Sequence, residues 1–116
     1  MANDTVRRAL LFDFYGELLT DKQREYFDLH YNDDLSLAEI AEQTGISRQG
    51  VWDIIRRAET TLRNTEDKTG LIRRFEERRE KISEIRGELG CLLAYPDEAV
   101  RSAALAADAK LRTLED

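Results

Sequence analysis

The chain has 116 residues, of which 41% are apolar and 36% charged, a balance typical of helices that each have one buried and one charged face. Its 18 basic and 24 acidic side chains give a net charge of −6, so the overall field repels nucleic acid. Few prolines and glycines interrupt long helices, no apolar run approaches the ~20 residues of a membrane span, and no secretory pattern begins the sequence. We therefore expect an all-α, cytoplasmic protein without membrane insertion.

The first predicted helix begins at a cap provided by Asn3 or Asp4. Its apolar residues are dense enough to cover more than one face, which indicates burial on two sides. We expect one side to pack on the motif that follows, and the other to face a second subunit or the C-terminal helices. These apolar residues are Val6, Ala9, Leu10, Leu11, Phe12, Phe14, Tyr15, Leu18 and Leu19.

A second helix opens at Thr20, which has the spacing of a capping box with Gln23. The polar run 32–34 ends this helix and forms the loop into the next one. A supporting helix therefore precedes the bihelical motif, as three-helix versions of that motif require. The apolar side of the supporting helix consists of Tyr26, Phe27, Leu29, His30 and Tyr31.

Residues 36–58 are predicted to form a helix-turn-helix. Ser36 and Glu39 have the spacing of a capping box, which sets the start of the first helix. Gly45 ends that helix, because the left-handed backbone needed there costs little only when the residue has no Cβ. Ile46 then fills the space between the two helices.

The second helix of the motif starts at a Ser47 cap and is the candidate reader of DNA. Its inward side follows from apolar spacings of three and four, which place Val51, Ile54 or Ile55, and Ala58 against the supporting helices. The opposite side, near the helix N-terminus, is the part that meets base edges in a major groove. The predicted DNA-binding residues on this side are Arg48, Gln49, Trp52, Asp53 and Arg56.

These five residues differ in how well they suit DNA. Arginine can donate two parallel hydrogen bonds to guanine and glutamine can pair with adenine, which suits Arg48 and Gln49 to base readout. The indole of Trp52 suits it less, since it can stack or wedge in DNA, contact another protein, or pack beneath the C-terminal extension. Asp53 repels phosphate, although the segment 47–64 is locally positive, with four arginines against two acidic residues.

Past the motif the helical pattern weakens over residues 63–65, which fits a kink, a short linker or a continued helix. Of these we favour a break at which Thr65 caps a new helix. Glu66 and Asp67 would then lie in its first turn, where negative charge meets the positive end of the helix dipole. This places an N-terminal helix-turn-helix domain at residues 1–64 and a C-terminal helical extension at residues 65–116.

The extension is predicted to contain two helices with a corner at 95–97, because Pro96 disfavours helix in the residue before it. Each helix has an apolar seam, the first interrupted at Arg78, so the helices either pair between chains as a homodimer or fold back on each other. The basic run 73–81 is interleaved with glutamates, which favours a solvated face with intrahelical ion pairs over an RNA-binding strip. The seams are Leu71, Phe75, Ile82, Ile85, Leu89 and Leu92, and Val100, Ala104, Ala107, Leu111 and Leu114.

No catalytic, metal or cofactor site is predicted. The single cysteine, Cys91, allows no internal disulfide, and its apolar neighbours indicate a buried structural thiol. The only histidine, His30, lies in an aromatic helix, where a core or surface role fits better than partnership with a nucleophile. Paired carboxylates occur without the histidine, cysteine or glycine-rich loop that would make a metal, acid-base or phosphate site. We expect a protein that is not an enzyme and needs no cofactor.

Residues 19–62 resemble the promoter-reading region 4 of bacterial sigma factors. The resemblance rests on an L-T-x-x-Q-R opening, on S-L-x-E-I-A and on G-I-S-R-x-x-V. The whole chain, including the N-terminal RALLFDFYGELLTDKQREYFDLHYNDDLSLAEIAE and the long C-terminal helices, is more similar to the YlxM family of small bacterial helix-turn-helix proteins. The N-terminal two thirds carry most of this similarity. It implies an all-α fold and a part in the signal recognition particle (SRP) pathway.

Two functional hypotheses from different classes follow. The first is a regulator that places residues 48–56 in the major groove of duplex DNA, as a homodimer joined through its apolar helices. The second is an adaptor that contacts SRP protein or RNA through its helical surface, using Trp52 and the arginine-rich helix. Both assume the same fold, an all-α helix-turn-helix bundle of sigma region 4 type, without a winged helix and with a long C-terminal helical extension.

Overall fold

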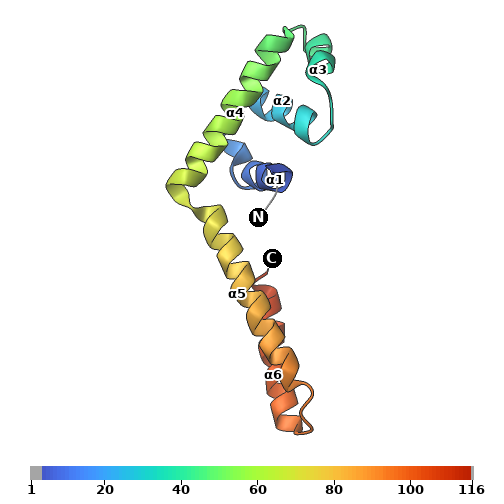
Figure 1. Cartoon of the computed structure of the whole chain (residues 1–116), viewed down its shortest axis with the longest axis vertical. Helices are drawn as coiled ribbons and strands as arrows, with labels where there is room; N and C mark the ends of the chain where they lie inside the picture. The colour runs from blue at the N-terminus through green and yellow to red at the C-terminus, as the bar shows by residue number, and fades with distance from the viewer. Residues whose placement is uncertain (1–3, 116) are drawn as a thin grey trace. The chain divides into compact units, whose positions relative to one another are not determined.

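The computed structural model describes residues 4–115. Within them the chain forms six α-helices, one 3₁₀ helix and no strand (Figure 1), which confirms the all-α prediction. No helix in this part of the chain is long and apolar enough to cross a membrane. The elements are α1 (Asp4–Tyr15), η1 (Gly16–Leu18), α2 (Asp21–Tyr31), α3 (Leu37–Thr44), α4 (Arg48–Thr69), α5 (Leu71–Leu92) and α6 (Glu98–Thr113).

The chain divides into two compact units, one ending at Ile72 and the other starting at Arg73. The predicted helix break at Thr65 is wrong, because α4 runs on without interruption past this residue. The hydroxyl of Thr65 donates to the carbonyl oxygen of Thr61 at 2.7 Å and caps no new helix. The domain boundary that we expected after residue 64 therefore falls inside α4.

The second helix of the motif continues this far because its inward face stays covered. Leu62 and Glu66 follow Ala58 at four-residue spacing, and all three are buried. Glu66 therefore lies near the C-terminal end of α4, whereas the sequence had placed it in the first turn of a new helix. The helix ends at Gly70, whose φ of 63° is in the left-handed region that favours glycine.

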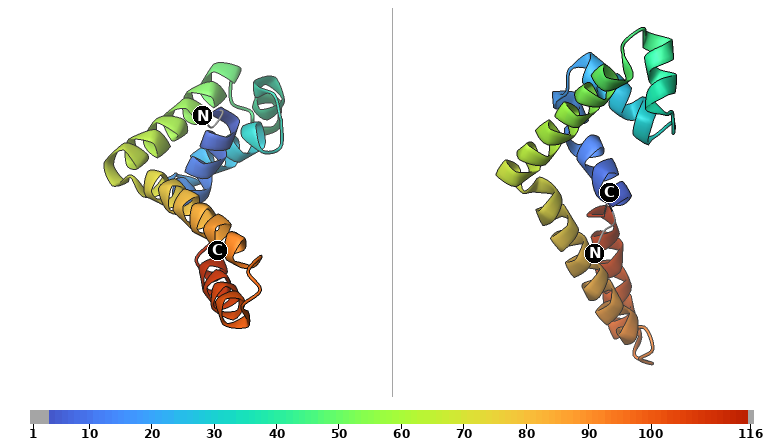
Figure 2. Two further views of the ribbon diagram at one scale, coloured as in Figure 1. Left: turned by 60° about the horizontal axis from the view of Figure 1, so that its bottom comes forward. Right: turned by 45° about the horizontal axis from the view of Figure 1, so that its top comes forward.

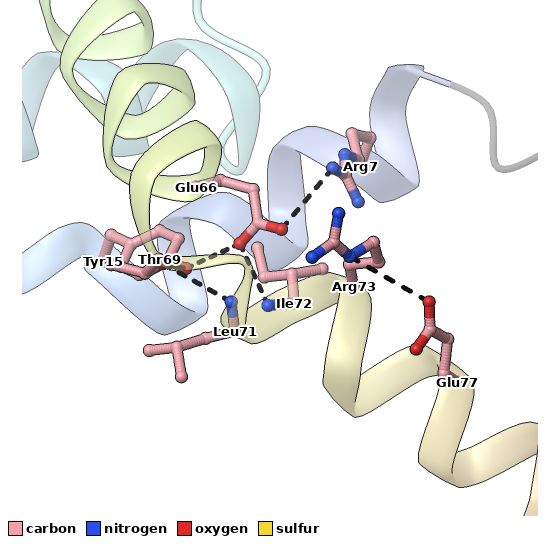
Figure 3. Close-up of polar contacts among 8 residues, drawn as sticks. All are labelled: Arg7, Tyr15, Glu66, Thr69, Leu71, Ile72, Arg73 and Glu77. Carbon is pink, nitrogen blue, oxygen red and sulfur yellow. Dashed lines mark hydrogen bonds and ion pairs between the residues drawn. The ribbon is translucent and has the colours of Figure 1, made fainter.

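The buried carboxylate of Glu66 organises this helix end (Figure 3). Its Oε1 accepts the phenol O–H of Tyr15 at 2.6 Å and the backbone N–H of Ile72 at 3.0 Å. Its Oε2 lies 4.0 Å from the guanidinium of Arg7, and the hydroxyl of Thr69 lies 2.6 Å from the Tyr15 oxygen. The helix dipole opposes a negative charge at a C-terminus. These donors and the arginine compensate for that opposition and for the loss of water.

The hydrophobic core of the first unit lies where α4 packs against α1, α2 and α3. The predicted packing of the first helix on the motif is thus confirmed. Asp4 lies within α1 and not before it, and the alternative cap, Asn3, lies outside the described residues. The capping box of Thr20 and Gln23 is confirmed at the start of α2, with amide-to-side-chain distances of 3.1 and 3.2 Å. The core residues are Leu11, Tyr15, Leu19, Tyr26, Phe27, Ile40, Val51, Ile55, Ala58, Leu62 and Ile72.

The second unit is a helical hairpin in which α6 folds back beside α5 (Figures 1 and 2). Arg86 of α5 joins the two helices, with its Nε 2.8 Å from Asp108 and its guanidinium 3.3 Å from Glu115. Of the apolar side chains described in this unit, only Ile82 and Ala104 are buried. The core of the hairpin is therefore small.

Cys91 is exposed near the end of α5, so the prediction of a buried thiol is wrong. Its apolar neighbours Leu92 and Leu93 are themselves exposed, at 37% and 40%. Adjacent residues on a helix point in different directions, so apolar neighbours in sequence do not cover a side chain.

Candidate nucleic-acid interface

The first helix of the motif, α3, begins and ends at the predicted residues. The Oγ of Ser36 accepts the backbone N–H of Glu39 at 3.0 Å, and the Glu39 carboxylate accepts the N–H of Ser36 at 3.0 Å. The hydrogen bond from the Ser36 amide holds the pKa of Glu39 below its usual value. Gly45 follows the helix with a φ of 77°. Local hydrogen bonds and one left-handed glycine thus fix both ends of α3.

The turn into α4 is tight because Gly50 has no side chain. Ser47 caps α4, and its Oγ accepts the backbone N–H of Gly50 at 3.0 Å. A Cβ on Gly50 would lie 2.8 Å from Cγ2 of Ile46, which packs against the core. Sequence reasoning identified Ile46 and Ser47 but missed the role of Gly50. The available signal was a glycine in the first turn of a helix, where its low helix propensity needs a compensating reason.

The inward face of α4 is the predicted one. Val51, Ile55 and Ala58 are fully buried, whereas Ile54 is half-buried. Of the two isoleucines that the spacing left open, Ile55 is therefore the core residue. This burial sets the rotation of α4 about its axis and hence the side chains that face outward.

The five predicted DNA-binding residues lie on the outer and lateral sides of the first turns of α4. Arg48, Gln49 and Arg56 are exposed, and Trp52 and Asp53 are half-buried. Among residues 4–115, Arg48 and Arg56 form no ion pair. The exposed part of α4 therefore carries two guanidinium groups and one amide that are available to a partner.

The positive charge of α4 is smaller than a count of its arginines suggests. Arg57 lies 3.4 Å from the Asp53 carboxylate, one turn away, and Arg63 lies 3.3 Å from Glu59. Both pairs have partly exposed side chains, so each contributes little to stability. Their effect is local: the charge of Asp53, which would repel phosphate, is partly neutralised by Arg57.

Glu59 also joins α4 to α1. The Nε of Arg8 donates a hydrogen bond to Oε1 of Glu59 at 2.6 Å. The guanidinium of Arg8 also lies 4.2 Å from the centre of the Tyr31 ring. Burial alone would raise the pKa of Glu59, but the hydrogen bonds and charges of Arg8 and Arg63 outweigh it and hold this pKa below its usual value. Sequence reasoning missed this cluster, because Arg8 and Glu59 are 51 residues apart.

Trp52 lies at the edge of the core. Its ring meets that of His30 edge to face, with centroids 6.5 Å apart. The Nδ1 of His30 is hydrogen-bonded to the carbonyl oxygen of Leu35 at 2.8 Å, which ties α2 to the loop before α3. His30 therefore has a structural role, and its ring helps to hold the Trp52 indole in place.

Trp52 also borders an open hollow of about 400 Å³, whose other lining residues are Leu37, Arg48 and Gln49. Leu37 is the first residue of α3 and Arg48 is the first residue of α4. The hollow therefore lies where both helices of the motif begin. Its lining combines two apolar side chains with two that donate hydrogen bonds, and no acidic residue lines it.

The chemistry available at this face is that of binding. Arginine and glutamine side chains supply hydrogen-bond donors and charge, and the indole supplies an apolar surface. Within the described part of the chain, no three histidine, cysteine, aspartate or glutamate side chains are grouped so that they could hold a metal ion.

Comparison with known proteins finds relatives of the part of the chain that contains this face. The profile of the UPF0122 family, described as “Putative helix-turn-helix protein, YlxM / p13 like”, matches residues 2–91. A UPF0122 protein of Geobacillus kaustophilus is 51% identical over 86 residues, which cover 74% of this chain and 78% of the relative. A UPF0122 protein of Thermoanaerobacter sp. (strain X514) is 50% identical over 86 residues, which cover 74% of each chain. The last helix, α6, lies beyond the matched residues.

Proposed function

Because the chain belongs to the UPF0122 family of YlxM/p13-like helix-turn-helix proteins, we propose that it is a cytoplasmic DNA-binding regulator whose α4 enters the major groove of duplex DNA. The observation that carries the proposal is the exposure of Arg48 and Arg56 on the second helix of the motif, without ion pairs among residues 4–115. A helix-turn-helix brings the N-terminal part of this helix to base edges. The resemblance of residues 19–62 to sigma region 4 supports the same orientation.

Three of the predicted residues contact DNA through hydrogen bonds or charge in this proposal. Arg48 donates two hydrogen bonds to guanine and Gln49 pairs with adenine. Arg56 follows Arg48 by eight residues, about 12 Å along the helix, and contacts a phosphate or a base further along the groove. Asp53 makes no attractive contact with DNA, and its pairing with Arg57 at 3.4 Å reduces its repulsion of phosphate.

We also propose that the regulator is a homodimer joined through the hairpin of α5 and α6. The supporting observation is that this hairpin buries only Ile82 and Ala104 among its described apolar residues, while Ile85 and Leu92 on one side of α5 remain 42% and 37% exposed. A helical unit with so small a core needs further packing to be stable. A two-fold dimer would double a weak DNA contact and bind a palindromic site.

The adaptor hypothesis uses the same face differently. In it, Trp52 and the exposed helical surface contact SRP protein or RNA, and DNA is not a ligand. The partial exposure of Trp52 beside an open hollow supports a protein contact as well as a DNA contact. Salt dependence separates the two only in part: binding of DNA or of SRP RNA releases counterions and weakens steeply with salt, whereas a protein contact centred on the indole is less sensitive.

The proposal is tested by incubating the full chain with a random-sequence pool of duplex DNA at low and physiological salt, and with SRP protein and RNA in parallel. We expect the recovered duplexes to converge on one motif that contains a guanine and an adenine, with an affinity that falls steeply as salt increases. Binding of SRP components alone, with no duplex retained at low salt, would refute the regulator and favour the adaptor.

A further inference from the structure

We infer that the hollow between the first turns of α3 and α4 takes the methyl group of a thymine, with Trp52 and Leu37 as the residues that select this base. The inference rests on the proposed function and adds to it a preference for one base at one position. It also gives a role to the indole of Trp52, which has none in the hydrogen-bonding contacts proposed for Arg48 and Gln49.

The position of the hollow is the first argument. Its lining joins the first residue of α3, Leu37, to the first turns of α4, where Arg48, Gln49 and Trp52 lie. When α4 occupies a major groove, its N-terminal residues are those nearest to the base edges. The hollow opens beside these residues, so a base edge that meets Arg48 or Gln49 brings the neighbouring base to Trp52.

The rigidity of the indole is the second argument. Trp52 packs against the core and meets the His30 ring edge to face, and His30 is itself hydrogen-bonded to Leu35 at 2.8 Å. The indole surface toward the hollow therefore needs little ordering when a ligand arrives. A preformed apolar surface loses less entropy on binding than a mobile side chain does.

The chemistry of the lining selects the occupant. In the major groove, thymine presents a methyl group beside one acceptor, and purines present acceptors to arginine and glutamine. The lining of the hollow offers apolar surface from Trp52 and Leu37 and donors from Arg48 and Gln49, with no acidic residue among them. The apolar side chains match the methyl group of thymine, and the donors match the acceptors of a neighbouring purine. The positive charge of Arg48 suits the nearby phosphates.

The size of the expected preference follows from one methyl group. Burial of one methyl group strengthens binding by about 4-fold. Replacement of thymine by uracil removes that methyl and leaves the hydrogen-bonding pattern of the base unchanged. It is therefore a matched change on the DNA side.

The experiment measures the affinity of the full chain for its selected duplex and for the same duplex with deoxyuridine in place of thymine, one strand at a time. We expect weaker binding by about 4-fold for each contacted methyl in the wild type. The ratio of the two affinities should approach 1 in Trp52→Ala and in Leu37→Ala. Because both affinities of a variant are measured on one preparation, the ratio does not depend on the fraction of folded protein.

Arg56→Ala is the control variant, because Arg56 does not line the hollow. It should weaken binding of both duplexes and preserve their ratio. Equal affinities of the wild type for the two duplexes would overturn the inference and leave DNA binding intact. A ratio that is unchanged from the wild type in both Trp52→Ala and Leu37→Ala would overturn it in the same way. Absence of any duplex binding by the wild type would refute the proposed function and the inference together.

A second readout uses the fluorescence of Trp52, the only tryptophan in the sequence. We expect the thymine duplex to shield the indole from acrylamide quenching more than the uracil duplex does, at equal saturation. Quenching that is unchanged by saturating thymine duplex would also contradict the inference, since an occupied hollow covers the indole.

Discussion

The phenol of Tyr15 in α1 donates a 2.6 Å hydrogen bond to the buried carboxylate of Glu66 in α4, across 51 residues of sequence. The same carboxylate oxygen accepts the backbone N–H of Ile72 beyond the end of α4. The contact thus connects the first helix of the unit to the point at which the long second helix of the motif ends. Burial and this hydrogen bond raise the pKa of Tyr15, so the folded state holds the phenol in its neutral, donating form.

Tyr15→Phe should lower the free energy of unfolding by about 1–3 kcal/mol, because the buried Glu66 loses one of its donors. Urea unfolding followed by circular dichroism measures this loss. Tyr95→Phe is the matched control, since Tyr95 is 55% exposed, and it should leave the free energy unchanged. Equal stability of the two variants would show that the phenol contributes nothing to the first unit.

Gly50→Ala should destabilise the first unit by roughly 1 kcal/mol, although alanine has the higher helix propensity. The added Cβ would lie 2.8 Å from Cγ2 of Ile46, and the resulting shift in packing outweighs the propensity gain of about 1 kcal/mol. Gly87→Ala is the matched change in α5, where an added Cβ would lie in open space, with no atom within 4 Å apart from its chain neighbours and the nearby backbone of its own helix. It should stabilise the protein. A gain in melting temperature for both variants would contradict the packing of Ile46 over Gly50.

Much of the fold was predictable because local signals determined it. The Thr20 and Ser36 capping boxes and the left-handed Gly45 are patterns within a few residues, and all are confirmed. The end of α4 was not predictable in the same way. Thr65 resembles a cap in sequence, but the burial of Leu62 and Glu66 keeps the helix intact, and that burial depends on contacts with distant residues.

Glu59→Gln should lower the free energy of unfolding by roughly 1 kcal/mol at pH 7, because Arg8 and Arg63 lose their charged partner. The folded state holds the pKa of Glu59 below its usual value. Its contribution is therefore present above the unfolded pKa of about 4.5 and is lost as the pH falls through the folded pKa. The difference between variant and wild type should shrink from pH 6 to pH 3.

Glu84→Gln, an exposed change of the same charge on α5, is the control at pH 7 and should leave the free energy of unfolding unchanged, because the side chain is exposed. A difference for Glu59→Gln that stays constant with pH would exclude an electrostatic origin and point to lost packing.

Ile85→Lys should convert a dimer into a monomer, if the hairpin of α5 and α6 pairs between chains. The isoleucine is 42% exposed in one chain, and a buried lysine at a two-fold interface would repel its own copy. Sedimentation equilibrium at micromolar concentration measures the mass. Leu18→Lys, an exposed change in the first unit, should keep the dimer. A wild-type chain that is monomeric at this concentration would refute the proposed assembly.

The candidate interface was predictable in position and only partly in chemistry. Helical spacing placed Arg48, Gln49 and Arg56 on the exposed side, and the structure agrees. It could not show that Arg57 and Arg63 are paired and that Trp52 rests on His30. The His30 contact joins two helices, so no pattern within either helix reports it, and the two ion pairs depend on side-chain conformations that spacing does not specify.

The assignment of Arg48 and Arg56 as DNA-binding residues is tested most directly by the affinity of the Arg48→Ala, Arg56→Ala double variant for the selected duplex. Arg101→Ala, Arg112→Ala removes the same two charges from α6, where both arginines form ion pairs. We predict a loss of at least about 30-fold for the first variant, since each contact is worth ~1–3 kcal/mol, and a much smaller loss for the second. Equal affinities of the two variants, with both folded, would contradict the assignment of α4 as the reading helix.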